Sequence, residues 1–197
     1  MKDYLDYDGL AVMAHRGGSL EAPENTIESF KYALEIGSDI IETDIQLSSD
    51  GIPYIFHDDD LERIPGIEKN FNELLASEID ELNIFDDYKI PTLEETLKQF
   101  PNTKFQIDFK TDEVVDPAIE IINKLPHIKK NLCVASFSSQ RLQKIKSKLS
   151  DVTYSMGPHE VLKLLLKSFG IYRGEISGDC LHCLLYTSDA ADELCRG

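Results

Sequence analysis

Residues 39–48 read DIIETDIQLS, an apolar strand with two carboxylates in its interior. Ile40, Ile41 and Ile45 supply the bulk that is typical of a buried strand. Because side chains alternate faces along a strand, Glu42 and Asp44 point to the same side. Two like charges on one face of a buried strand are costly unless a partner neutralises them. The stretch therefore predicts both a sheet and a site that compensates these charges.

Five more apolar runs of strand length occur along the chain, at 10–15, 53–57, 104–109, 131–137 and 151–156. Helical patterns fall between most of them, at 25–37, 91–100, 138–149 and 158–170. Asn25 with Glu28 is a candidate capping box for the first helix, and Thr92 with Glu95 is one for the second. Strands that alternate with helices predict an α/β fold with a parallel sheet, either doubly wound or an eight-stranded barrel.

Residues 58–88 break this alternation, because they are polar and contain only a short helical pattern near 71–80. We expect them to leave the sheet and form a lid or cap.

Composition restricts the class of protein. The 197 residues are 42% hydrophobic, enough for one sizeable core, and no run approaches the 18 apolar residues of a membrane-spanning helix. The first residues lack the basic and apolar regions of a secretory signal, which favours a cytoplasmic protein. The net charge of −16 argues against nucleic acid or an anionic membrane as a partner. A small anionic substrate would need a site made positive locally.

Polar side chains follow the ends of the predicted strands, where chemistry gathers in parallel α/β folds. They are His15, Arg16, Glu42, Asp44, His57, Asp58, Asp108, Lys110 and Ser136. Glu42, Asp44 and Asp108 offer hard oxygen ligands, which suit Mg²⁺, Ca²⁺ or Mn²⁺. Arg16 and Lys110 can hold an anionic oxygen. His15 and His57 can act as general acid and base. Together these residue types indicate phosphoryl chemistry.

Each residue also has a purely structural interpretation. A histidine at a strand end is more often a hydrogen-bonded core or loop residue, and a Glu-x-Asp pair is more often a solvated face. Arg16 can be a simple salt-bridge partner. The convergence of these groups on one rim, in strand order, favours the functional interpretation.

The motifs at these positions resemble the glycerophosphodiester phosphodiesterase family over residues 10 to about 157. The matching motifs are His15-Arg16-Gly17, Pro23-Glu24-Asn25-Thr26, Glu42-x-Asp44, Asp50-Gly51, His57-Asp58, and the segments IPTLEETL (90–97), QIDFK (106–110) and ASF (135–137). The resemblance implies a (β/α)8 TIM barrel that hydrolyses a glycerophosphodiester, a small molecule, to glycerol 3-phosphate and an alcohol.

The resemblance also implies roles for single residues. His15 and His57 would be the acid/base pair, Arg16 and Lys110 would contact the phosphate, and Glu42, Asp44 and Asp108 would bind the divalent cation. The family commonly has Glu where this chain has Asp108, so a water could stand between that carboxylate and the metal. Glu24, a candidate for the entry to the first helix, would also orient Arg16.

Two other activities fit the same residues. A lyase on this fold would form a cyclic phosphate through attack by a neighbouring hydroxyl of the substrate. A binding module without activity would keep the phosphate site alone.

The end of the chain departs from the barrel pattern. A barrel of this type needs roughly 250 residues and eight strands, and we find six strands and the start of a seventh at 176–182. Residues 183–193, CLLYTSDAADE, resemble a translated sequencing adapter, so we interpret 1–182 as a partial domain and 183–197 as a non-native tail; a natural divergent tail is the alternative. The Cys180–Cys183 pair then carries no zinc or redox meaning. An incomplete barrel leaves strand edges and apolar interior uncovered, so we expect the chain to aggregate or to be nearly inactive.

Overall fold

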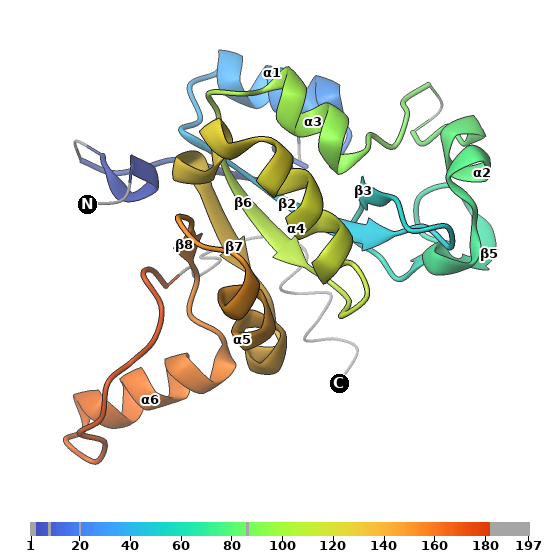
Figure 1. Ribbon diagram of the computed structural model, residues 1–197. Helices are drawn as coiled ribbons and strands as arrows, with labels where there is room; N and C mark the ends of the chain where they lie inside the picture. Colours follow the sequence, from blue (N-terminus) through green and yellow to red (C-terminus); the bar gives the residue numbers. More distant parts are fainter. Residues whose placement is uncertain (1–2, 8, 20, 86, 182–197) are drawn as a thin grey trace.

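The computed structural model describes residues 3–7, 9–19, 21–85 and 87–181. All six predicted strands are present in its main sheet: β1 (Met13–His15), β2 (Ile40–Leu47), β3 (Pro53–Ile55), β6 (Lys104–Phe109), β7 (Leu132–Ala135) and β8 (Thr153–Tyr154). Five of them run parallel in the order β1-β2-β6-β7-β8 (Figure 1). Over the described ranges, this sheet does not close into a complete barrel.

The expectation that the run 53–57 belongs to the parallel set is wrong, because β3 is antiparallel to β2. Only residues 48–52 join the two strands, which is too short for a parallel crossover. Gly51 closes the turn with a φ of 89°, in the left-handed region that glycine adopts without strain. β1 pairs with the first half of β2 and β3 with the second half. The hairpin therefore returns His57 toward the middle of β2.

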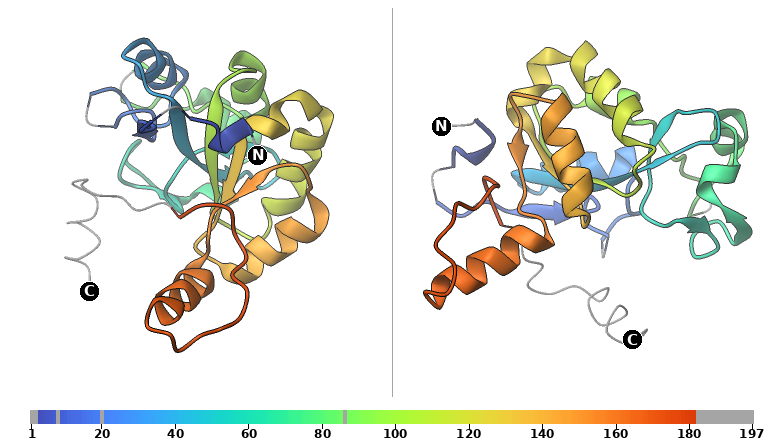
Figure 2. Two further views of the ribbon diagram at one scale, coloured as in Figure 1. Left: turned by 90° about the vertical axis from the view of Figure 1, so that its left-hand side faces the viewer. Right: turned by 60° about the horizontal axis from the view of Figure 1, so that its bottom comes forward.

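Helices α1 (Ile27–Glu35), α3 (Leu93–Gln99), α4 (Val115–Lys124) and α5 (Ser139–Lys148) lie along the outer face of the sheet (Figure 2). Their buried side chains and those of the strands form one large apolar core. α4 is not among the predicted helices. Pro117 interrupts its sequence pattern, although proline is tolerated in the first turn of a helix.

The first helix begins one residue later than predicted. Thr26 is the N-cap of α1, and its hydroxyl accepts a hydrogen bond from the backbone of Ser29 at 3.1 Å. The capping box is therefore Thr26 with Ser29, and the predicted box of Asn25 with Glu28 is wrong. The predicted box of Thr92 with Glu95 is confirmed at the start of α3.

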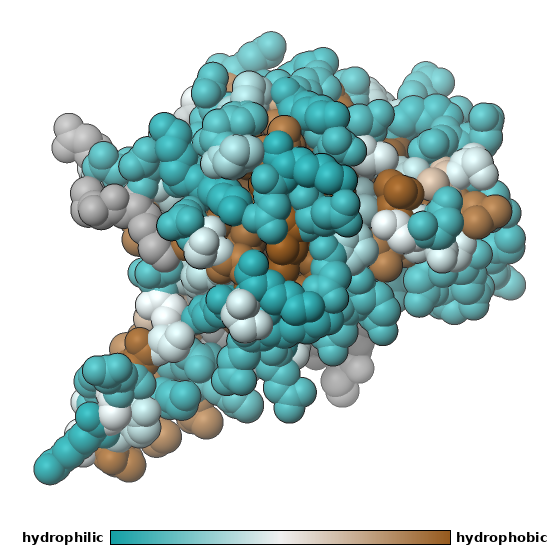
Figure 3. Space-filling view, in the orientation of Figure 1, coloured by the Kyte–Doolittle hydropathy of each residue, from teal (hydrophilic) through white to brown (hydrophobic). Residues whose placement is uncertain are grey.

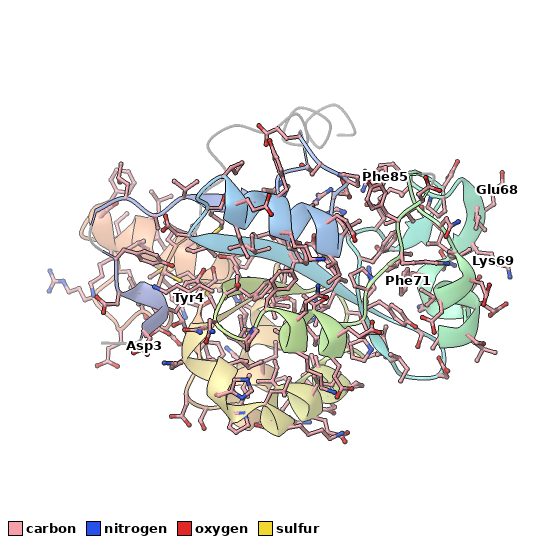
Figure 4. All side chains as sticks on the ribbon, turned by 90° about the horizontal axis from the view of Figure 1, so that it is seen from above. Asp3, Tyr4, Glu68, Lys69, Phe71 and Phe85 are labelled. Carbon is pink, nitrogen blue, oxygen red and sulfur yellow. The ribbon has the colours of Figure 1, made fainter. Side chains whose placement is uncertain are left out.

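Residues 58–88, which we call the cap segment, have a small apolar core of their own. They form the hairpin β4 (Asp60–Leu61) and β5 (Ile67–Asn70), the short helix η2 (Phe71–Glu73) and α2 (Ala76–Glu81). Phe71 stacks on Phe56 with ring centroids 4.8 Å apart, which fixes the cap segment to the residues that follow β3. Figure 4 shows Phe71 pointing inward while Glu68 and Lys69 point outward. In Figure 1 the segment lies at the carboxyl end of β2.

The opposite end of the sheet is covered by η1 (Asp3–Leu5), where Tyr4 packs among Ile40 and Cys133. The short helix η3 (Pro126–Asn131) precedes β7, and α6 (Pro158–Ser168) follows β8. The predicted seventh strand is represented by one parallel bridge between Ser155 and Cys180. The predicted non-native tail, 183–197, lies outside the described residues, and with it the second cysteine of the CLHC pair. In the described ranges, no helix has both the length and the apolar character needed to cross a bilayer.

Candidate active site

The end of β1 places His15 and Arg16 against Glu42 of β2. His15 and Glu42 are register partners, and the His15 Nε2 lies 3.8 Å from the Glu42 carboxylate. The chain then turns sharply with a φ of 51° at Arg16, whose backbone N–H donates to Glu42 Oε2 at 3.1 Å. Gly17 continues the turn so close to α1 that a Cβ there would clash with Ser29 and Phe30. The turn therefore needs glycine, and it fixes two predicted site residues at once.

Asp44 and Asp108 are register partners on β2 and β6, and Lys110 neutralises both. The Lys110 Nζ lies 2.8 Å from Asp44 Oδ1 and 2.9 Å from Asp108 Oδ2. The Arg16 Nε lies 3.7 Å from Asp44 Oδ2. Two cations thus approach the carboxylate that looked unsatisfied in the sequence of β2.

Burial and local charges shift the pKa values of the three carboxylates of β2 and β6 in different directions. Burial raises the pKa of Glu42 well above its ordinary value, and the nearby Asp44 carboxylate adds to the rise. Burial also acts on Asp44, but Lys110, His57 and Arg16 outweigh it and lower the pKa of that group. The pKa of Asp108 is raised by burial, and Lys110 offsets only part of this effect. Asp44 is therefore the carboxylate that keeps its charge most readily.

The donor chemistry of this cluster fits a hard divalent cation. Glu42, Asp44 and Asp108 are 8%, 2% and 4% exposed, and such buried carboxylates require compensation by cations or hydrogen bonds. Asp108 Oδ1 is buried and accepts no hydrogen bond, so one ligand-type oxygen stays free. Among the described residues, however, no three His, Cys, Asp or Glu side chains are arranged as a ready-made metal cage. The predicted metal role of the three carboxylates stays a prediction.

His57 enters the site from the residues after β3. The backbone N–H of Phe56 donates to the Asp44 carbonyl at 3.1 Å, which holds this segment beside β2. The His57 Nδ1 lies 2.6 Å from Asp58 Oδ1. Burial acts to raise the pKa of Asp58, but hydrogen bonds from His57 and Arg63 lower it to about 2. Since an ionised carboxylate only accepts hydrogen bonds, Nδ1 of His57 carries a proton and Nε2 is left for chemistry.

Three residues have roles that sequence reasoning did not assign. Asn25, taken only as a helix cap, has a φ of 56°; its amide donates to Asp44 Oδ2 at 3.3 Å and accepts from the Thr43 hydroxyl at 2.8 Å. Arg63 of the cap segment binds Asp58 and Glu24. Asp58 was noted as a polar residue after a strand and as part of a motif, without a role of its own. The sequence feature that could have revealed the role of Asn25 is its position just before a helix, where asparagine readily adopts a positive φ.

The structure supports the expected contact of Glu24 with Arg16, since the Glu24 Oε1 accepts from the Arg16 Nη1 at 3.3 Å. Ser136, in contrast, serves the backbone. Its hydroxyl donates to the Phe109 carbonyl at 3.0 Å and accepts from Arg141 at 3.1 Å. The site thus contains seven of the predicted residues, which lie in or shortly after β1, β2, β3 and β6. Ser136 is not part of it.

Comparison with known proteins gives one consistent result. The model of the glycerophosphoryl diester phosphodiesterase family matches residues 15–165. The chain is 32% identical over 167 residues to a glycerophosphodiester phosphodiesterase of Caldanaerobacter subterraneus subsp. tengcongensis, covering 78% of this chain and 65% of that protein. It is 32% identical over 158 residues to human glycerophosphodiester phosphodiesterase 1, covering 74% of this chain and 48% of that protein. The chain thus spans about half to two thirds of the length of these relatives.

A solved structure of similar fold is that of an Oleispira antarctica phosphodiesterase in complex with the product sn-glycerol-3-phosphate. It is 28% identical, with a TM-score of 0.68, and the match covers 74% of this chain and 65% of that one. Together with the parallel sheet and its outer helices, this likeness confirms the predicted fold class, an incomplete (β/α)8 barrel.

Proposed function

Because the chain belongs to the glycerophosphoryl diester phosphodiesterase family, we propose that it hydrolyses glycerophosphodiesters to glycerol 3-phosphate and a free alcohol. One observation carries the proposal. Arg16 and Lys110 meet at Asp44, in a buried cluster that also receives His15 and His57. Fixed cations next to two imidazoles suit a reaction in which a phosphate oxygen gains charge while protons move.

Each side chain has a chemical task in this proposal. Arg16 and Lys110 attract the phosphate oxygens, the former with a planar fork and the latter as a point charge. One imidazole removes a proton from the attacking water, and the other protonates the leaving alcohol. His57 is held by Asp58, so that its Nε2 faces the reaction. His15 lies against Glu42, whose pKa is raised by burial.

We further propose that Glu42, Asp44 and Asp108 hold a divalent cation, Mg²⁺, Ca²⁺ or Mn²⁺. When bound, such an ion offsets the three carboxylates and polarises a phosphate oxygen. The free Oδ1 of Asp108 supports this assignment. Asp108 is one methylene shorter than the glutamate common at this position, which leaves space for an intervening water.

The experiment measures glycerol 3-phosphate release from glycerophosphocholine by this chain and by a fusion that continues it with the C-terminal part of a relative. We expect His15→Ala and His57→Ala each to lower the rate on the order of 10²–10⁴-fold. His127→Ala is the matched control, because His127 is exposed on η3 at the opposite end of the sheet. Full activity in either site variant would contradict the acid/base assignment.

Two further readouts separate the parts of the proposal. Activity that persists in EDTA and in Glu42→Ala would exclude the metal role while leaving the hydrolysis in place. Phosphorus NMR of the products distinguishes the alternatives, since a cyclic phosphate would identify the lyase reaction. Phosphate binding without turnover, in chain and fusion alike, would identify a binding module.

A further inference from the structure

Arg63 of the cap segment binds two carboxylates beside the site. It lies between β4 and β5, and its Nε donates to Asp58 Oδ2 at 2.7 Å. Its Nη1 and Nη2 donate to the two carboxylate oxygens of Glu24 at 3.2 and 2.5 Å. The guanidinium therefore spans two carboxylates that are 39 and 5 residues away in sequence. Such a fork fixes both partners in orientation as well as in distance.

Each of these two carboxylates also contacts a residue with a role in the proposed reaction. The second oxygen of Asp58 contacts His57 Nδ1 at 2.6 Å. Glu24 also receives a hydrogen bond from Arg16 Nη1 at 3.3 Å. Arg63 is thus one bridging carboxylate away from the acid/base histidine and one away from the phosphate-binding arginine.

We propose that Arg63 is a positioning residue, which orients His57 through Asp58 and Arg16 through Glu24 and thereby makes the docked cap segment part of the active site. The inference rests on the function proposed above. It assigns Arg63 no contact with the substrate.

Each of the two carboxylates has two hydrogen-bonding partners and needs both. Without Arg63, Asp58 Oδ2 loses its donor, and rotation of the carboxylate would loosen the hydrogen bond to His57. Glu24 would keep Arg16 as its charged partner, which strengthens the pull on a guanidinium whose Nε lies 3.7 Å from Asp44. Both shifts move a functional group away from the cluster.

The cap segment is anchored firmly enough to transmit this constraint. Besides the Phe56–Phe71 stack, the Tyr54 hydroxyl donates to Asp80 at 2.7 Å, and Gln46 donates to Asp59 at 2.9 Å. These contacts connect β2 and β3 to Asp59 and Asp80 of the segment, so Arg63 is carried by a packed unit.

An ordinary surface ion pair is the competing interpretation, because the Arg63 side chain is 44% exposed and exposed pairs contribute little. The burial of the two carboxylates favours the positioning role over a surface ion pair, since the side chains of Glu24 and Asp58 are only 9% and 19% exposed. Removal of Arg63 would leave two largely buried charges with one cationic contact fewer each.

The test compares Arg63→Gln and Arg63→Lys with Lys69→Gln in the full chain. Lys69 is an exposed cation of the same segment, so its variant matches the charge change. We expect Arg63→Gln to lower kcat/KM about 10–100-fold, by analogy with the loss seen when the outer partner of a metal-ligating histidine is removed. Arg63→Lys should restore part of the loss, because a single ammonium cannot serve both carboxylates. Equal activity of Arg63→Gln and Lys69→Gln would overturn the proposal.

A second measurement does not depend on turnover. In ¹H–¹⁵N NMR spectra of the imidazoles, the Nδ1 proton of His57 should exchange slowly in the parent and in Lys69→Gln, and faster in Arg63→Gln. The signal of the exposed His127 should stay unchanged in all three. An unchanged His57 signal in Arg63→Gln would overturn the positioning role. A fusion that hydrolyses no glycerophosphodiester, while the chain shows the change in the His57 signal, would contradict the proposed function and still support the contact.

Discussion

For single residues, the order of the predicted strands was enough to identify most of the site. His15, Glu42 and Asp108 could be assigned because parallel strands bring their carboxyl ends to one rim. Lys110 was the least specific of the predicted residues, yet it proves to be the partner shared by two buried aspartates. Arg63 could not be assigned, because the turn that carries it has no periodic pattern and one of its partners, Glu24, lies 39 residues away in sequence.

The charge on Asp58 predicts how stability depends on pH. Its folded-state pKa of about 2 lies below the ordinary value of about 3.9, so the unfolded chain binds protons more readily. The stabilisation is therefore fully present above about pH 4 and is lost as the pH falls toward 2. We expect Asp58→Asn to lower the free energy of unfolding by about 2 kcal/mol at pH 7 and by little at pH 2.

Urea unfolding of the parent and of Asp58→Asn at both pH values measures this difference. Glu94→Gln is the control, because Glu94 pairs with Lys98 on the exposed side of α3 and its loss should cost little at either pH. A difference between the parent and Asp58→Asn that stays constant from pH 7 to pH 2 would rule out the linkage.

For helices and strands, the pattern of apolar residues identified where most of them occur but not how their ends are built. β3 was taken as parallel although its five-residue connection and the Asp50-Gly51 turn are typical of a hairpin. The start of α1 was misplaced by one residue because Asn25, Thr26 and Ser29 all have side chains that can cap. The choice was decided by Asp44, which engages the Asn25 amide and leaves the cap to Thr26.

The cap of α1 can be tested directly. Thr26→Ala removes the hydroxyl that accepts from the Ser29 backbone, and we expect a loss of about 1 kcal/mol in the free energy of unfolding. Glu28→Ala removes the residue of the rejected capping box, and its cost should be only a few tenths of a kcal/mol. Chemical denaturation at pH 7 provides both values. The reverse order of the two losses would restore the box of Asn25 with Glu28.

At the scale of the whole molecule, the alternation of strands and helices correctly predicted a parallel sheet with helices outside. It did not predict that the cap segment has its own apolar core, because its aromatic anchors are scattered through a polar sequence. That core nevertheless matters for function, since Phe56, which it holds, immediately precedes His57. The whole fold therefore positions the site from two sides, the barrel sheet and the cap segment.

The apolar side of α6 predicts the behaviour of the chain in solution. Leu162 and Leu165 are each 53% exposed, and Figure 3 shows apolar residues gathered over this helix at the lower left. A contiguous apolar surface promotes association, so we expect the chain to self-associate at micromolar concentration. Leu162→Glu with Leu165→Glu should reduce light scattering and the binding of a hydrophobic dye, whereas Lys167→Gln, which alters charge on the same helix without removing apolar surface, should not. Scattering that is unaffected by the double leucine variant would place the associating surface elsewhere on the molecule.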